Sequence, residues 1–186
     1  KLGVIIQDPV VESHLERYKA TIAADYDAYR GHIYRVMSYS LHYLSEEEGQ
    51  QYRKAIGCAL VYHDIGLWTD GTLAYLEPSR DHAAADLSSE FTGEELELIR
   101  NIVYWHHKVT PFEGKHANVV NAVRKADWID ATRGLVPQGM PRVHIKDCVA
   151  SLPYNGFHDV LMGFGFKLYG NDIVRIVKEL SSILKY

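Results

Sequence analysis

The sequence predicts an all-α fold, and three observations lead to this prediction. Apolar residues recur at spacings of three and four along most of the chain, which is the pattern of amphipathic helices. The alternation that indicates strands is almost absent, and residues typical of helix ends flank several periodic segments. With 186 residues, 47% of them hydrophobic, the chain is long enough for one substantial core. We therefore expect a single domain over residues 1–186.

The first two predicted helices cover residues 32–44 and 46–65. In "HIYRVMSYSLHYL" one stripe with helical spacing contains Ile33, Val36, Met37, Ser40, Leu41 and Leu44. His32 is expected to open this helix at the edge of the stripe. In "EEEGQQYRKAIGCALVYHDI", His63 follows Ile56 and Leu60 on the inner face, and Asp64 lies one helical turn beyond Leu60.

Two further helices are predicted in the middle of the chain. "GEELELIRNIVYWHHKV" has Thr92 as a candidate N-cap and acidic residues in its first turn, and it stops before Pro111. "NVVNAVRKADWIDATRG" ends at Gly134 with Arg133 in its last turn, as helices often do. Between the second and third helices, residues 66–80 form the longest stretch without a clear period.

The C-terminal part, residues 135–186, is predicted to be a loop followed by further helix. "LVPQGMPRV" is typical of a loop because of its prolines and glycine. "GNDIVRIVKELSSIL" predicts a closing helix with Asn171 or Asp172 as its cap. This extension either covers a pocket or only supports the bundle.

Composition narrows the classes of function. The net charge is −4 and no Lys/Arg block is present, which argues against an extended nucleic-acid partner but permits a small charged substrate. No apolar run approaches the ~20 residues of a membrane helix. Cys58 and Cys148 match neither a zinc pattern nor a disulfide framework, so we expect the reducing cytoplasm. A homodimer, with some of the 13 tyrosines at its interface, stays open.

Several ionisable residues are predicted to face the core. At about 100° per residue, His106 lies near the middle of the apolar arc of its helix and His107 toward its edge. Asp127 and Asp130 share a stripe with Val120, Val123 and Ala126. Burying such groups costs a few kcal/mol each unless a charge or hydrogen bond compensates them. One or two divalent or trivalent ions would compensate all of them, and imidazole and carboxylate suit iron, manganese, zinc, nickel or cobalt.

The order of these residues resembles the H…HD…D signature of the HD superfamily of metal-dependent phosphohydrolases. The resemblance spans residues 29–133 and rests on "YRGHIYRV" around His32, "HDIG" at His63 and Asp64, and "ADWID" at Asp127. It implies an all-α HD-domain bundle with the metal site at its centre. Asp130 is then expected to support a ligand rather than to bind metal itself.

Dinuclear members of this superfamily have two further histidines. The resemblance assigns these positions to His82, in "SRDHAAAD", and to His106 or His107, with His106 preferred. The implied ligands are His32, His63, Asp64, His82, His106 and Asp127, with Asp64 as the bridge. Two departures from the family pattern, Leu67 in place of a common Lys and the lack of a GYP motif, disfavour a cyclic-dinucleotide phosphodiesterase.

The resemblance implies hydrolysis of a small phosphate ester or nucleotide by a metal-bound hydroxide, with Asp64 and His63 as the catalytic pair. Arg35 and Lys108 are candidates for binding an anionic, phosphate-containing substrate. Trp68 and Tyr75 are candidates for stacking on a base, or are core aromatics. Two other functions stay open: a diiron oxygenase that cleaves a C–P or C–C bond, and a non-catalytic module that a metal stabilises.

Overall fold

The computed structural model describes residues 3–170 and 172–184, and this part of the chain is helical without a β-strand. The all-α prediction is confirmed. Besides a short 3₁₀ turn at Ala23–Asp25, the helices are α1 Pro9–Glu16, α2 Lys19–Ile22, α3 Tyr26–Tyr43, α4 Glu46–Tyr62, α5 Gly66–Thr69, α6 Leu76–Leu87, α7 Gly93–Trp105, α8 Ala117–Ala131, α9 Arg142–Ser151, α10 Phe157–Tyr169 and α11 Ile173–Leu184.

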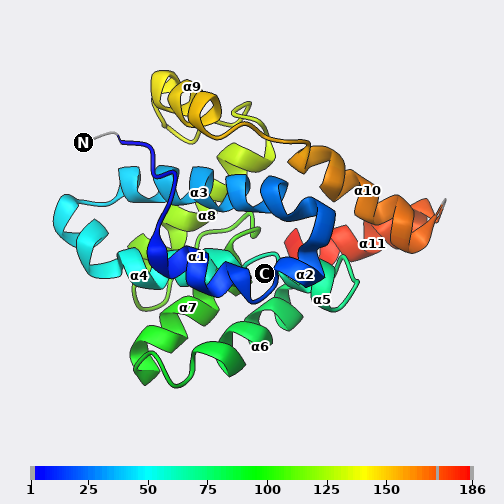
Figure 1. Cartoon of the computed structure of the whole chain (residues 1–186), viewed down its shortest axis with the longest axis horizontal. Helices are drawn as coiled ribbons and strands as arrows, with labels where there is room; N and C mark the ends of the chain where they lie inside the picture. Colours follow the sequence, from blue (N-terminus) through cyan, green and yellow to red (C-terminus); the bar gives the residue numbers. More distant parts are fainter. Residues whose placement is uncertain (1–2, 171, 185–186) are drawn as a thin grey trace.

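Helix α3 is the central element of the bundle. It packs most extensively against α8 and also contacts α4, α9 and α10. Figure 1 shows α3 running across the molecule, with α6 and α7 below it and α9 above it. Its inward residues Tyr29, Ile33, Val36 and Met37 are completely buried. Residues on the inner face of α3 are therefore shielded from water by neighbours from both halves of the chain.

The helix ends agree with the start and stop signals of the sequence. Thr92 accepts a hydrogen bond from the Glu95 N–H and Glu95 bonds back to Thr92 N–H, a capping box that begins α7. After α8, Gly134 adopts φ +79° and donates its N–H to Ile129 O at 2.7 Å. Helix α8 itself ends at Ala131, three residues before the predicted Gly134, so Arg133 lies beyond its last turn and adopts φ +54° together with the glycine.

Several boundaries differ from the prediction. Helices α4 and α7 end at Tyr62 and Trp105, before the predicted Ile65 and Val109. Helix α3 begins at Tyr26, so His32 lies in its second turn, because buried Ala28 and Tyr29 extend the apolar stripe toward the N-terminus. Helix α9 begins at Arg142, inside the predicted loop, directly after Pro141, a residue that is tolerated at a helix start. Residues 66–80 contain α5 and the first turns of α6.

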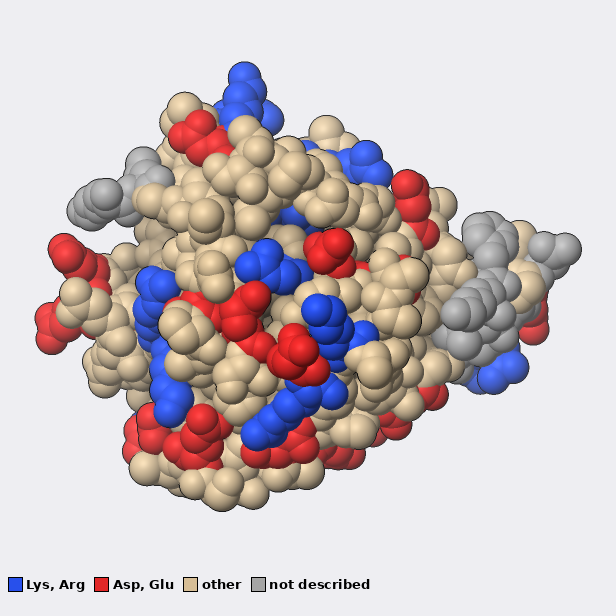
Figure 2. Space-filling model, in the orientation of Figure 1, with Lys and Arg blue, Asp and Glu red and all other residues tan. Residues whose placement is uncertain are grey.

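The closing helix is found at α11. Asp172 caps it, since its Oδ1 accepts the Arg175 N–H at 3.0 Å, whereas Asn171 lies outside the described residues. No helix in the described ranges has both the length and the apolar character to cross a membrane. On the face shown in Figure 2, acidic and basic side chains are interspersed and form no continuous basic surface.

Candidate metal centre

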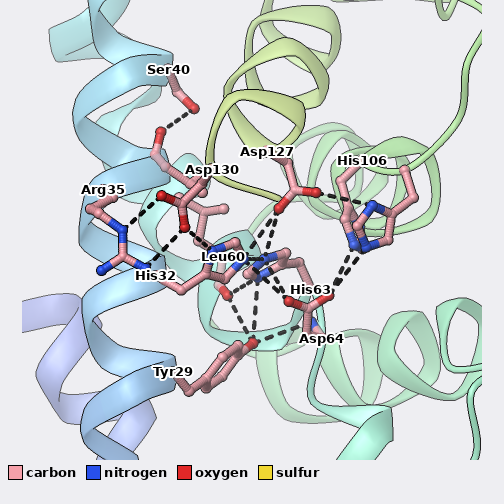
Figure 3. A network of polar contacts seen from close by, with 12 residues as sticks. Tyr29, His32, Arg35, Ser40, Leu60, His63, Asp64, His106, Asp127 and Asp130 are labelled. Carbon is pink, nitrogen blue, oxygen red and sulfur yellow. Dashed lines mark hydrogen bonds and ion pairs between the residues drawn. The ribbon is translucent and has the colours of Figure 1, made fainter. Parts of the chain in front are cut away.

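Four buried side chains from three parts of the chain converge at the centre of the bundle (Figure 3). His32 comes from α3, His63 and Asp64 from the turn that follows α4, and Asp127 from α8. One potential ligand atom from each lies within 4.8 Å of the others. This convergence fits the expectation that the H…HD…D residues share a site.

A second group, Asp64, His106 and His107, adjoins the first and shares Asp64 with it. Asp64 Oδ2 lies 3.1 Å from His63 Nε2, while its Oδ1 lies 3.1 Å from His106 Nε2. The two oxygens of Asp127 likewise face different histidines: Oδ1 lies 3.2 Å from His32 Nε2, and Oδ2 lies 3.0 Å from His107 Nδ1. Each carboxylate therefore offers one oxygen to each group.

Helix ends orient two of the imidazoles. His63 directly follows α4, and its Nδ1–H donates to Leu60 O at 2.5 Å. His106 directly follows α7 in the same manner, and its Nδ1–H donates to Val103 O at 2.6 Å. The last carbonyls of a helix have no partner within the helix, so each histidine supplies one. A carbonyl can only accept, hence Nδ1 carries the proton and Nε2 faces the cluster in both rings.

Burial and neighbouring charges determine the protonation of these groups. Burial, together with the charge of His107, lowers the pKa of His106 to about 4, so its ring is neutral near pH 7. Burial raises the pKa of Asp64, but the charge of His63 and the contacts with the surrounding imidazoles hold it well below its ordinary value. For Asp127 the opposing contribution comes first from His107, and the pKa is again well below the ordinary value. Both carboxylates are therefore ionised.

The unshared electron pairs of this cluster point at one another. The neutral His106 has its proton on Nδ1, so its Nε2 presents a lone pair to the Asp64 carboxylate at 3.1 Å. His32 Nε2 and His63 Nε2 lie 2.8 Å apart, so protons on both nitrogens would point at each other. The two oxygens of Asp127 are buried without a hydrogen bond. Such an arrangement is unfavourable unless a cation lies between the donors.

The spacing and the chemistry of the donors fit a transition metal. Two ligand atoms that are each ~2.1 Å from one ion and at a right angle are about 3 Å apart. The imidazole and carboxylate atoms of the first group are separated by 2.8 to 3.4 Å. Both cysteines are buried elsewhere and are not members of either group, so the donors are nitrogen and oxygen alone. Such a set suits iron, manganese, zinc, nickel or cobalt.

Without a metal the first group takes up protons instead. Burial lowers the pKa of His63, but the neighbouring Asp64 and Asp127 raise it by a larger amount, and the resulting pKa is about 9. For His32, burial again lowers the pKa, whereas contacts with the carboxylates of Asp127, Asp130 and Asp64 raise it well above the ordinary value. Protons and a metal therefore compete for the same atoms.

Asp130 and Arg35 orient His32 from behind. Asp130 Oδ2 accepts the His32 Nδ1–H at 2.6 Å, which turns Nε2 of that ring toward the cluster. Arg35 holds the same carboxylate with two bonds, Nε to Oδ1 at 2.7 Å and Nη2 to Oδ2 at 3.0 Å. The supporting role expected for Asp130 agrees with these contacts. A carboxylate behind a ligating histidine fixes its orientation and raises its basicity.

The HDIG turn needs its glycine because another segment passes close by. A Cβ atom on Gly66 would lie 2.8 Å from Tyr75 O and 3.0 Å from Ser79 Oγ. The Gly66 N–H donates to Ser79 Oγ at 2.8 Å. Tyr29 holds the other side of the turn, since its hydroxyl donates to Val61 O at 2.7 Å and accepts the Asp64 N–H at 3.2 Å. Both contacts fix the backbone that carries His63 and Asp64.

Aromatic rings cover the cluster and leave one edge open. The Phe157 ring, from the start of α10, stacks on His32 at 4.0 Å between centroids. The ring of Tyr75 packs against both His106 and His107. The side chain of His107 is 15% exposed, whereas those of the other cluster members are 2% exposed or less. His107 is therefore the member of the cluster that is most exposed to solvent.

Three expected site residues lie elsewhere. His82 is not part of the cluster: its side chain is 38% exposed on α6 and its Nε2 lies 2.9 Å from Asp70 Oδ1. The phase of α6 turns Ser79 and Ala83 inward and leaves His82 at the outer edge. Arg35 is completely buried against Asp130 and is therefore not accessible to a substrate. Lys108 is 2% exposed, and its Nζ lies 4.7 Å from the centre of the Tyr104 ring.

Sequence reasoning did not select three residues that shape the site: Tyr29, Phe157 and His158. His158 Nε2 donates to Asp130 O at 2.7 Å, which ties α10 to α8. Tyr29 precedes His32 by three residues, so a helical reading extended upstream would have placed it on the same face. For Phe157 and His158 no local signal exists, because they meet the site only through the tertiary fold.

No protein-family model, curated protein or solved structure matches this chain.

Proposed function

We propose that this chain is a metal-dependent hydrolase of small phosphate esters or nucleotides. The observation that carries the proposal is the position of the Asp64 and Asp127 carboxylates between two groups of imidazoles. Each carboxylate directs one oxygen at each group. Carboxylates that bridge two ions are a recurring feature of phosphoryl-transfer sites. The resemblance of His32, His63, Asp64 and Asp127 to the HD signature supports the same chemistry.

Two ligand groups are assigned in this proposal. His32, His63, Asp64 and Asp127 would hold one ion, and Asp64 with His106 and His107 would hold a second. Bound metal would supply a water of lowered pKa near neutrality and a Lewis acid for a phosphoryl oxygen. His107, as the partly exposed member, lies where a substrate would enter.

The residues of the chain contribute positioning and exclusion of water. Asp130 keeps Nε2 of His32 directed at the centre, and the backbone carbonyls of Leu60 and Val103 do the same for His63 and His106. Phe157 and Tyr75 limit the access of water to the cluster. Low local polarity strengthens every charge interaction with an anionic substrate.

Elemental analysis and a phosphatase screen test the proposal. Protein purified without added metal is analysed for iron, manganese, zinc, nickel and cobalt, and then assayed with p-nitrophenyl phosphate and nucleoside monophosphates, before and after chelation. We expect a stoichiometric metal, activity that chelation removes, and restoration by the same metal. Asp127→Asn should abolish both metal retention and activity, whereas Asp81→Asn, an exposed aspartate outside the cluster, should change neither.

The same measurement separates two other functions. An oxygenase requires redox-active iron, and the nitrogen and oxygen donors of this cluster suit iron as well. Iron retained only under anaerobic purification, with oxygen uptake and no phosphate release, would replace hydrolysis by this second candidate. Stoichiometric metal without any turnover would leave a metal-stabilised binding module, and no metal binding at all would overturn the proposal.

A further inference from the structure

A cavity of about 480 Å³ lies away from the metal cluster, between the end of α8 and one face of α9. Its lining includes Arg142, Ile145, Lys146 and Val149, which follow one another at helical spacing along α9. Arg133, Gly134 and Tyr154 supply the opposite side. The volume lies within the range of sites for small organic ligands.

Three cations surround this cavity without an acidic partner. Arg133, Arg142 and Lys146 are exposed, and none of them forms an ion pair with a carboxylate of the described residues. This grouping is unusual in a chain whose net charge is −4. Pro141, the N-cap of α9, provides no side-chain bond to the first N–H groups of that helix, so the positive end of the helix adds to the same potential.

The remaining lining is apolar or aromatic. Ile145, Val149 and the ring of Tyr154 form the wall between the cations, and Tyr154 is half-buried. The guanidinium carbon of Arg133 lies 5.7 Å from the centre of the Tyr154 ring. A ligand with an anionic group for the cations and an apolar group for this wall would satisfy both halves.

Tyr154 also connects the cavity to the metal cluster. The Arg35 guanidinium lies 4.6 Å from the centre of the Tyr154 ring, and its Nη1 donates to Leu152 O and Pro153 O, which directly precede that residue. Arg35 in turn holds Asp130, the carboxylate that orients His32. A continuous series of contacts, Tyr154 to Arg35 to Asp130 to His32, therefore joins the two places.

We propose that the cavity between α8 and α9 binds a small organic anion, a phosphate or carboxylate that carries an apolar group, and that its occupancy changes the metal affinity at His32. Binding in the cavity stands independently of the proposed function. The coupling to metal rests on that function. By linkage, an anion that alters metal affinity must have its own affinity altered by metal to the same factor.

Calorimetric titration of the full chain in EDTA tests binding. The probes are phenyl phosphate, phenylacetate and inorganic phosphate, so that the two anionic groups and the apolar part are compared. We expect saturable binding of phenyl phosphate or phenylacetate, at least tenfold tighter than that of inorganic phosphate. The double variant Arg133→Gln/Lys146→Gln should lose at least tenfold in affinity.

Two further variants control this titration. Lys19→Gln removes an exposed cation that lies over the Tyr26 ring, as Arg133 lies over Tyr154, and should leave binding unchanged. Ala150→Trp fills the cavity without removing a charge and should abolish binding. Circular dichroism confirms that each variant is folded. If no organic probe binds the native chain, or if the double variant binds equally well, the cavity is not an anion site.

Metal titration with and without saturating anion tests the coupling. In the native chain we expect the metal dissociation constant to change at least fivefold with anion present, and in Arg133→Gln/Lys146→Gln to stay constant. An effect of equal size in the double variant would arise from direct anion–metal contact and would refute the coupling. A chain that binds anion in EDTA but no metal would overturn the proposed function together with the coupling, while the anion site would stand.

Discussion

Asp130 accepts the His32 Nδ1–H at 2.6 Å and thereby determines which nitrogen of His32 faces the cluster. The carboxylate itself is fixed by two hydrogen bonds from Arg35. Neither residue is among the candidate ligands, yet the orientation of the first ligand depends on both.

Asp130→Asn should weaken metal binding by about 10–100-fold, the usual effect of removing a carboxylate behind a ligating histidine. The amide can present its NH₂ group to His32, which would favour the wrong tautomer. Metal competition with a chromophoric chelator measures the change. Asp81→Asn serves as the control, and equal affinities for the two variants would contradict the role of Asp130.

Arg35→Gln should destabilise the fold rather than weaken substrate binding alone. Arg35 and Asp130 are both completely buried, and removing one partner of a buried pair costs about 3–5 kcal/mol. Urea unfolding of the metal-free chain measures this loss. A variant of native stability with only a raised KM would instead favour the substrate role that the sequence suggested for Arg35.

His106→Gln and His82→Gln should behave differently. His106 Nε2 faces Asp64 within the cluster, whereas His82 lies outside it beside Asp70. A ligand that binds only the folded state stabilises it by about 4.1 kcal/mol at a thousandfold excess over Kd. The rise in Tm on adding metal should therefore persist in His82→Gln and be reduced in His106→Gln. Loss of the effect in His82→Gln would restore the six-ligand assignment.

Gly66→Ala should destabilise the HDIG turn by about 1–3 kcal/mol, the usual cost of overpacking. The new Cβ would lie 2.8 Å from Tyr75 O, a backbone atom that cannot move independently. Gly163→Ala is the matched control, because nothing lies within 4 Å of its Cβ and alanine favours a helix interior. Chemical unfolding measures the free energy of unfolding of both variants. An unchanged stability of Gly66→Ala would contradict the close contact between residue 66 and Tyr75 O.

His14 should make the fold sensitive to mild acid. Burial lowers its pKa below 6.5, although the charge of Glu90 opposes this shift. The unfolded chain therefore binds a proton near pH 6.5 that the folded chain binds only at lower pH, so stability falls as the pH decreases through this window. Urea unfolding in EDTA at pH 7.5 and pH 5.5 should show a smaller loss for His14→Gln than for the native chain. An equal loss in both would assign the acid sensitivity to other groups.

The sequence predicted the helices and the convergence of most candidate ligands better than it predicted the residues that surround them. The period of three and four placed His63, His106 and Asp127 on inner faces, because a helix orients its residues by local geometry. The prediction that His82 joins the cluster was wrong because the stretch that leads into α6 has no clear period, so the inward face of that helix could not be identified. The positions of Arg35 and Phe157 depend on partners about a hundred residues away in the chain, and no local pattern encodes such contacts.

A fragment that ends at Arg133 would retain every candidate ligand but would lose what surrounds them. It would lack the carbonyl oxygens of residues 152 and 153 that receive the Arg35 Nη1–H groups, and the Phe157 ring that shields His32. The imidazole would then be hydrated on its open side, and the buried guanidinium would lack acceptors. Dissection of this chain at the edge of its motif would separate the donor atoms from the scaffold that gives them their geometry.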